Sequence, residues 1–372
     1  MARLMIGITQ SASGFNNCHR HFPELIEAVK RGVLAAGGLP LDFPTISLGE
    51  VFSLPTLSED DIMRIVVHGQ QAFGKSVLDA LLERGENVVG VYCAPEPAQG
   101  GGRVDPLKEA ALARGLPVYQ PRSFRNKPEV WEEFARLKAD LCVMAYVTLI
   151  VPEEVLNQPT RGTIQYHPSL LPRHRGPSSI NWPIMMGETR TGLSIFWPDQ
   201  GLDTGPILLQ KDVEIRDSDT LGSLYFERLY PLGVAALLEA VDLVRAGTAP
   251  RIVQDESQAT YEGWCKKEHV QIDWQKPIQA IWNLIRGADP QPGAWTTHEG
   301  TTVQLLDAKK LAGATPGRPG EVIAVDDAGL TIAATGGQIQ VTRVRPEGGQ
   351  KGNAGAFAKS AGLRPGVRLG AT

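Results

Sequence analysis

Short apolar runs alternate with amphipathic stretches from Met63 to residue 246. The apolar runs begin near residues 64, 88, 117, 141, 163 and 193. After the first of them, apolar side chains recur at helical spacing (Val77, Leu78, Leu81, Leu82). Buried strands separated by helices are typical of a doubly wound, mostly parallel sheet. The sequence therefore predicts an α/β domain over residues 63–246.

The pattern changes after residue 246. Residues 247–261 form a polar, extended linker, and from residue 262 on short β segments are separated by turns rich in Gly, Pro and Asp. The predicted strands are Gln271–Trp274, 302–306, 321–325, 330–334 and 338–345, with an amphipathic helix at Pro277–Gly287. This spacing favours a small open β-barrel as the C-terminal domain, residues 262–372.

The first 62 residues have a separate pattern. A short apolar strand and a Gly/Ser/Asn-rich loop lead into a helix that begins near Phe22-Pro23 and ends near Gly37-Gly38. A segment of this size is too short to close a core of its own. We therefore interpret residues 1–62 as a fused fragment and leave its independent folding open.

Composition narrows the functional classes. The 372 residues are 42% hydrophobic and 21% charged, with a net charge of −4, which argues against a strong binder of nucleic-acid backbones. No apolar stretch approaches the ~20 residues that span a membrane, and no signal peptide opens the chain. We expect a cytoplasmic enzyme with no membrane partner. The cysteines are scattered without metal-like spacing, so no metal site is predicted.

Two turn-rich motifs carry the candidate chemistry. The segment 167–176 reads HPSLLPRHRG, and 201–205 reads GLDTG. A histidine held by a carboxylate is the usual acid–base unit of acyl transfer, so His167 and Asp203 are the predicted catalytic pair. Because both follow predicted strands of one parallel sheet, we expect them in one crevice at its carboxyl edge. Gln165 shares the face of His167 on the preceding strand, where it is either an oxyanion donor or a solvated amide.

These motifs resemble the folate-dependent formyltransferases, and most closely the hydrolase domain of the 10-formyltetrahydrofolate dehydrogenases. The resemblance runs from Met63 to Leu369. It rests on segments such as MRIVVHGQQAFGKSVLDALLERGENVVGVY (63–92), IQYHPSLLPRHRGPSSINW (164–182), GLSIFWPDQGLDTGPILLQK (192–211) and IRGADPQPGAW (285–295). The family implies 10-formyltetrahydrofolate as co-substrate and an Asn–His–Asp catalytic set. His167 and Asp203 match that set, whereas Gln165 stands at the asparagine position.

The resemblance also implies the folate site. The loop after the 192–197 strand would line the pterin pocket with backbone groups, and the end of the 141–147 strand would supply an apolar wall. The residues assigned in this way are Asp199, Gln200, Gly201 and Leu202 for the loop and Met144, Ala145, Tyr146 and Val147 for the wall.

Hydrolysis or transfer of the formyl group is the predicted function. Hydrolysis is favoured because the dehydrogenases' hydrolase domain also lacks the asparagine. The alternatives are a methionyl-tRNA formyltransferase, with tRNA as partner, and a sugar-amine formyltransferase. Methionyl-tRNA formyltransferases carry a basic loop after the second strand, whereas residues 94–109 here read APEPAQGGGRVDPLKE, with one arginine. A folate-binding protein without turnover is a further alternative.

The N-terminal segment resembles the start of the dihydroxy-acid dehydratases. In that family the cysteine that corresponds to Cys18 ligates an iron–sulfur cluster, and the other cluster cysteines lie in a region absent from this chain. One thiolate cannot hold such a cluster, so none is expected.

Overall fold

The computed structural model describes residues 5–10, 22–36, 39–44, 62–95, 104–314 and 316–370. The chain forms two compact units, Met1–Ile62 and Met63–Thr372. The finer boundaries predicted at residues 246 and 262 stay a prediction. Cys18 lies outside the described residues.

The first unit contains a β-α-β arrangement. Strand β1 (Met5–Gln10), helix α1 (Phe22–Ala35) and strand β2 (Leu39–Pro44) follow one another, and β1 pairs with β2 in parallel. The strand at Leu39–Pro44 is absent from the sequence predictions. Its two prolines, Pro40 and Pro44, lower the strand signal because proline cannot donate to a ladder.

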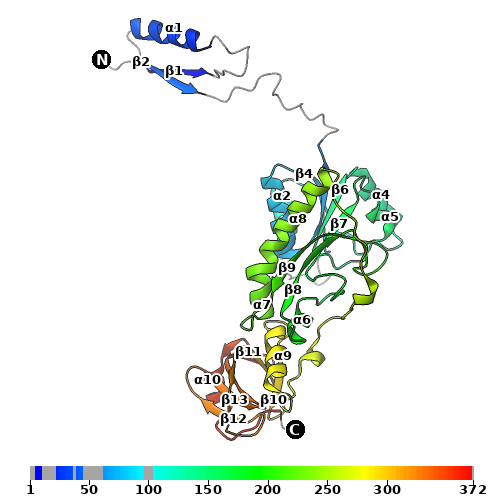
Figure 1. Cartoon of the computed structure of the whole chain (residues 1–372), viewed down its shortest axis with the longest axis vertical. Helices are drawn as coiled ribbons and strands as arrows, with labels where there is room; N and C mark the ends of the chain where they lie inside the picture. Colours follow the sequence, from blue (N-terminus) through cyan, green and yellow to red (C-terminus); the bar gives the residue numbers. More distant parts are fainter. Residues whose placement is uncertain are drawn as a thin grey trace. The chain divides into compact units, whose positions relative to one another are not determined.

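The second unit begins with a seven-stranded sheet in the order β5-β4-β3-β6-β7-β8-β9 (Figure 1). The five strands from β5 to β7 in that order pair in parallel, and β8 and β9 are antiparallel. This confirms the predicted doubly wound, mostly parallel fold. The strands are β3 (Arg64–Gly69), β4 (Asn87–Cys93), β5 (Val118–Tyr119), β6 (Leu141–Ala145), β7 (Thr163–His167), β8 (Arg190–Phe196) and β9 (Ile207–Glu214).

Helices cover both faces of this sheet. On one face, α2, α3 and α8 enclose a core that includes Val77 and Leu237, and on the other face α4 and α5 pack around Phe134 and Val155. The helices are α2 (Gln71–Glu83), α3 (Pro106–Ala113), α4 (Pro128–Arg136), α5 (Glu153–Leu156), α6 (Asn181–Met185), α7 (Leu221–Leu224) and α8 (Tyr230–Arg245).

Strand β8 corrects one prediction. It runs antiparallel to β7, with His167 opposite Ser194 and Gln165 opposite Phe196. The end of β8 therefore does not lie at the carboxyl edge of the parallel strands, and the expectation that both motifs reach one crevice by that route was wrong. The switch in direction follows from a connection through the short helix α6, which is not a full crossover.

The predicted helix over Leu221–Ala246 is interrupted. Between α7 and α8 the chain forms a π-helix at Tyr225–Leu229. Pro231 explains the break, because proline lacks the N–H that would bond to Glu227 and its ring would clash with that carbonyl. Figure 1 shows α8 lying along the sheet beside α2.

The C-terminal part is a curled antiparallel sheet with its own core, in the order β10-β11-β14-β13-β12, with β15 paired to β14. This confirms the predicted small open β-barrel, which takes the form of a curled half-barrel. Its elements are β10 (Trp295–His298), β11 (Thr301–Ala312), β12 (Val322–Val325), β13 (Leu330–Ala334), β14 (Gly337–Pro346), β15 (Gly352–Asn353), α9 (Ile278–Ala288), α10 (Ala354–Ser360) and two 3₁₀ turns (Glu256–Gln258, Lys267–Val270).

The predicted strand Gln271–Trp274 does not form. Only Gln271 makes an isolated bridge, with Trp295. The Asp273 side chain accepts the backbone N–H of Gln275 and turns the chain at this point. Among the helices that the structure describes, none is long and apolar enough to cross a membrane.

Candidate functional site

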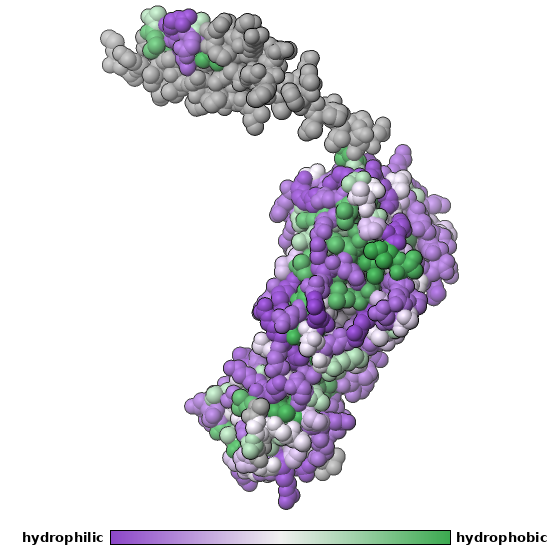
Figure 2. Space-filling view, in the orientation of Figure 1, coloured by the Kyte–Doolittle hydropathy of each residue, from purple (hydrophilic) through white to green (hydrophobic). Residues whose placement is uncertain are grey.

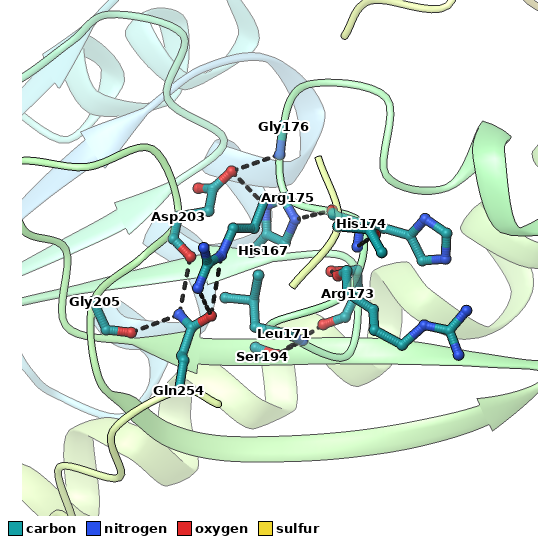
Figure 3. A network of polar contacts seen from close by, with 12 residues as sticks. His167, Leu171, Arg173, His174, Arg175, Gly176, Ser194, Asp203, Gly205 and Gln254 are labelled. Carbon is teal, nitrogen blue, oxygen red and sulfur yellow. Dashed lines mark hydrogen bonds and ion pairs between the residues drawn. The ribbon is translucent and has the colours of Figure 1, made fainter. Parts of the chain in front are cut away.

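His167 is the last residue of β7 and is buried, with 5% of its surface exposed. Its Nε2 atom lies 2.9 Å from the carbonyl oxygen of His174. Its Nδ1 atom lies 3.6 Å from Oδ2 of Asp203. Figure 3 shows both partners around the imidazole. The structure therefore brings the predicted histidine and carboxylate together.

The loop between β8 and β9 returns Asp203 to His167. Oδ1 of Asp199 accepts hydrogen bonds from Gly201 N and Thr204 Oγ1, which closes the loop on itself. Asp203 has a φ of +59°, and its Oδ2 accepts the backbone N–H of Gly176 at 2.9 Å. Asp203 thus meets His167 through a folded-back loop rather than through a shared sheet edge.

Gly176 must be glycine at this contact. Its φ is +104°, and a Cβ atom there would lie 2.3 Å from the carbonyl oxygen of Glu262. Both the backbone conformation and the close approach exclude a side chain. The glycine therefore allows the segment 167–176 to reach both Asp203 and the linker.

Residues of the linker hold the segment 167–176 in place. Arg175 is buried and donates from Nη2 to Oε1 of Gln254 at 2.8 Å and to Oε1 of Glu256 at 2.6 Å. The hydrogen bond with Glu256 raises the pKa of Arg175. Nε2 of Gln254 in turn donates to the carbonyl oxygens of Asp203 and Gly205 (Figure 3). Sequence reasoning missed Gln254 because it lies in a polar segment with no motif.

His174 also belongs to this network, although the sequence places it only in a turn between two arginines. Its ring is 3% exposed, with Nδ1 3.1 Å from Oε2 of Glu262 and Nε2 3.1 Å from Oε1 of Glu188. The partners lie far from it in the chain, so the motif alone carried no signal of these contacts.

Gln165 lies two residues before His167 on the same strand, and neighbours Met144 and Phe196 in the sheet. Its side chain is half-buried, and it has no hydrogen-bond partner among the residues described. The amide is thus available to a ligand, and its catalytic role stays a prediction.

The predicted folate segments differ in exposure. Met144 and Ala145 are buried in β6, Val147 is half-buried, and Tyr146 is 41% exposed with a φ of +65°. In the other segment Leu202 is 51% exposed. The space-filling view shows apolar residues gathered on the face of the larger unit turned to the viewer (Figure 2).

A cavity of about 250 Å³ adjoins the second of these segments through Gln200. It opens beside Gln200, whose Nε2 donates to Oε2 of Glu153 at 2.8 Å. Of the residues that line this cavity, only Gln200 was predicted from the sequence as part of the folate site. The lining residues are Arg125, Ile150, Val151, Pro152, Glu153, Glu154 and Gln200.

The amino end of α2 lies at the switch point of the sheet, beside the end of β6. A Cβ on Gly69 would lie 2.3 Å from the carbonyl oxygen of Ala145. The backbone N–H of Gln71 points at both carboxylate oxygens of Asp105, each 2.9 Å away. The chain's own carboxylate therefore occupies the anion position of this helix.

No group of three His, Cys, Asp or Glu side chains that could hold a metal ion occurs in the described part of the chain. The arrangement at His167 is instead suited to proton transfer next to a small reacting group.

Comparisons with known proteins agree with this geometry. Residues 63–241 match the family described as Formyl transferase, and residues 265–362 match Formyl transferase, C-terminal domain. Residues 3–65 match Dihydroxy-acid/6-phosphogluconate dehydratase N-terminal. Both resemblances noted in the sequence are thus confirmed.

Individual relatives point the same way. Mitochondrial 10-formyltetrahydrofolate dehydrogenase of Mus musculus is 42% identical over 72% of this chain, which spans only 29% of that protein. Methionyl-tRNA formyltransferase of Trichlorobacter lovleyi is 38% identical over 82% of this chain and 96% of its own length. The crystal structure of HypX from Aquifex aeolicus in complex with tetrahydrofolic acid shares the fold, with a TM-score of 0.61 at 21% identity over 81% of this chain and 47% of HypX. The chain belongs to the formyltransferase family of enzymes.

Proposed function

We propose that this enzyme releases the formyl group of 10-formyltetrahydrofolate to water. The observation that carries the formyl chemistry is the buried pair of His167 and Asp203, whose Nδ1 and Oδ2 atoms lie 3.6 Å apart. A folate co-substrate is supported by the names of the dehydrogenase relatives and by the tetrahydrofolic acid in the HypX structure.

In this proposal His167 moves the proton through Nδ1. Nε2 faces the His174 carbonyl, which can only accept, so Nε2 carries a hydrogen. Nδ1 of the neutral ring takes a proton from water as the water oxygen attacks the formyl carbon. When the bond from that carbon to N10 breaks, the proton passes to N10, and tetrahydrofolate and formic acid result. The formic acid then ionises to formate and releases a proton to the solvent. Asp203 stabilises the positive ring that forms in between.

The remaining groups would orient the substrate. Gln165 presents a half-buried amide on the same strand face as His167, from which it would donate to the oxyanion. The exposed Tyr146, Ile150 and Leu202 side chains would pack on the flat apolar rings of the folate. Backbone groups of Asp199–Leu202 would then line the pterin.

Two features favour water over a phosphate-bearing acceptor. Gln165 replaces the asparagine of the family's transferases. In addition, the Gln71 amide at the switch point already bonds to Asp105, so it is not free for the phosphate of a tRNA or a sugar nucleotide. Both features therefore favour water as the acceptor.

Transfer to methionyl-tRNA is the second candidate. It is supported by the Trichlorobacter lovleyi relative, which this chain matches over 96% of that protein's length. A sugar-amine acceptor and a folate-binding role without turnover are the further outcomes that the experiment must distinguish.

The test is spectrophotometric release of tetrahydrofolate from 10-formyltetrahydrofolate, with and without formylatable methionyl-tRNA or a sugar-amine nucleotide. We expect release without any acceptor, and its loss in His167→Ala with folate binding retained. Release that needs the tRNA or the sugar would show that water is not the acceptor. Near-normal release by His167→Ala would overturn the acid–base role, and tight folate binding without release would favour the binding role.

A further inference from the structure

The backbone carbonyl of His174 is the hydrogen-bond partner of the proposed catalytic imidazole, at 2.9 Å from Nε2 of His167. We propose that His174, held between Glu188 and Glu262, is a positioning residue that sets the tautomer and orientation of His167. This inference rests on the proposed function for its effect on turnover, but its effect on the His167 ring can be measured without turnover.

The tautomer follows from the chemistry of the partners. A carbonyl oxygen only accepts, so it selects the His167 ring with hydrogen on Nε2. The lone pair of the neutral ring then lies on Nδ1, on the side of Asp203. If the carbonyl moved away, the carboxylate of Asp203 would favour hydrogen on Nδ1 instead, and the neutral ring could no longer accept a proton there.

The His174 carbonyl does not point to His167 by default. His174 has a φ of +55°, a left-handed conformation that is unfavourable for a non-glycine residue. Its backbone N–H donates to Oγ1 of Thr260 at 2.8 Å, so the linker holds the peptide on one side. Contacts of the His174 side chain must hold the residue on its other side. A left-handed backbone conformation of a non-glycine residue persists only where the surrounding structure determines it.

The ring of His174 supplies those contacts. Nδ1 lies 3.1 Å from Oε2 of Glu262 and Nε2 lies 3.1 Å from Oε1 of Glu188, and the ring is almost fully buried. Carboxylates accept, so the ring satisfies both only by donating from both nitrogens. Glu188 also forms an ion pair with Arg173, the residue that precedes His174. The charged groups that face the ring are therefore Glu188, Glu262 and, through Glu188, Arg173.

The two carboxylates come from different parts of the chain. Glu188 follows α6, and Glu262 directly follows the linker. The His174 ring thus fixes the segment 167–176 to two different parts of the chain. Figure 3 shows this ring pointing away from His167, whereas the His174 carbonyl points toward it. The side chain acts on the reaction only through its own backbone.

The experiment uses the full chain with ¹⁵N-labelled histidine. We expect the wild type to show hydrogen on Nε2 of neutral His167. His174→Asn, which tolerates a positive φ but cannot bridge two carboxylates, should shift the His167 tautomer toward Nδ1–H. It should also lower kcat on the order of 10- to 100-fold, with KM for 10-formyltetrahydrofolate nearly unchanged.

Further variants keep the outcome decisive. Glu262→Gln removes one carboxylate and should cause a smaller shift in the same direction, so it serves if His174→Asn does not fold. His269→Asn, at an exposed position outside this network, is the matched control and should change neither readout. Unchanged His167 signals in both test variants would overturn the proposal. Changed signals in a protein that releases no tetrahydrofolate would support the positioning role and contradict the proposed function.

Discussion

The Asp203 carboxylate has two partners, the backbone of Gly176 and the imidazole of His167. One oxygen, Oδ2, accepts the backbone N–H of Gly176 at 2.9 Å and faces Nδ1 of His167 at 3.6 Å. Its backbone carbonyl is held by Gln254. The carboxylate is therefore placed by the structure around it, and its charge is available to the imidazole.

We expect Asp203→Asn to lower formyl release on the order of 10²- to 10⁴-fold, because the amide can still accept from Gly176 but cannot stabilise a positive His167 ring. Folate affinity and Tm should change little. Turnover assays and a fluorescence titration with tetrahydrofolate measure both effects. Asp212→Asn, at an exposed ion pair on β9, is the control. Full activity in Asp203→Asn would contradict the acid–base pair.

The stability of the fold should depend on pH through His68, a residue that has no part in the proposed mechanism. It lies near the end of β3, 5% exposed, between the rings of Tyr92 and Phe124. Burial lowers the pKa of His68 to about 3. In the unfolded chain a histidine takes up a proton below pH ~6.5. The folded state does not, so stability is complete above that pH and falls as the pH drops toward 3.

Between pH 7 and pH 5 this difference corresponds to about 2 kcal/mol in the free energy of unfolding. Between these pH values, the free energy of unfolding of His68→Leu should fall by about 2 kcal/mol less than that of the wild type. Denaturant titrations at the two pH values measure this difference. The same substitution at the exposed His269 should leave the decline as in the wild type. An unaltered pH dependence in His68→Leu would show that His68 titrates normally in the fold.

At the scale of elements, α8 seats on the sheet through a glycine. A Cβ on Gly233 would lie 2.6 Å from Cε2 of Tyr166 and 3.1 Å from the ring of Phe73. Those two rings, 4.5 Å apart, fill the space between α8, α2 and β7. Tyr166 alternates with Gln165 and His167 along β7, so the packing of its ring supports the strand that carries the site.

Gly233→Ala should therefore destabilise the larger unit by about 1–3 kcal/mol, since the rings cannot move far in a close-packed layer. Thermal unfolding of the variant measures this loss. Gly263→Ala, where a Cβ would meet no atom within 4 Å, is the matched control and should unfold like the wild type. A Tm for Gly233→Ala equal to that of the control would mean that the helix shifts without cost.

At the scale of the whole molecule, the formyltransferase part forms a compact unit of its own. Met63–Thr372 is one compact unit that contains both sheets and their cores. Its two sheets are joined by α6 and α9, where Nδ2 of Asn181 donates to the carbonyl oxygens of Gly287 and Gln291. Every contact given above for the candidate site joins described residues of this unit.

Removal of residues 1–62 should consequently leave tetrahydrofolate release and the Tm of the remaining chain nearly unchanged. The truncated and full-length proteins can be compared in the same turnover and calorimetric assays. A truncated protein that is unstable or inactive would show that the N-terminal unit contributes to the folded enzyme.

The sequence by itself determined the fold class and the two motifs that contain the candidate pair His167 and Asp203. The periodicity of apolar residues reveals buried strands and amphipathic helices, because the buried face of each element is written in its own local sequence. The motifs at 167–176 and 201–205 are visible because proline and glycine shape their own backbones. For the same reason His167 and Asp203 could be named before their distance was known.

Only the tertiary structure decided what surrounds that pair. The direction of β8, the return of Asp203 through a folded loop, and the ties from Gln254, Glu188 and Glu262 depend on contacts between segments far apart in the chain. A polar residue in a linker carries no periodic signal, because its partners are set by the way the elements pack. In the proposed function, proton transfer at His167 depends on those partners, which only the fold brings to the ring.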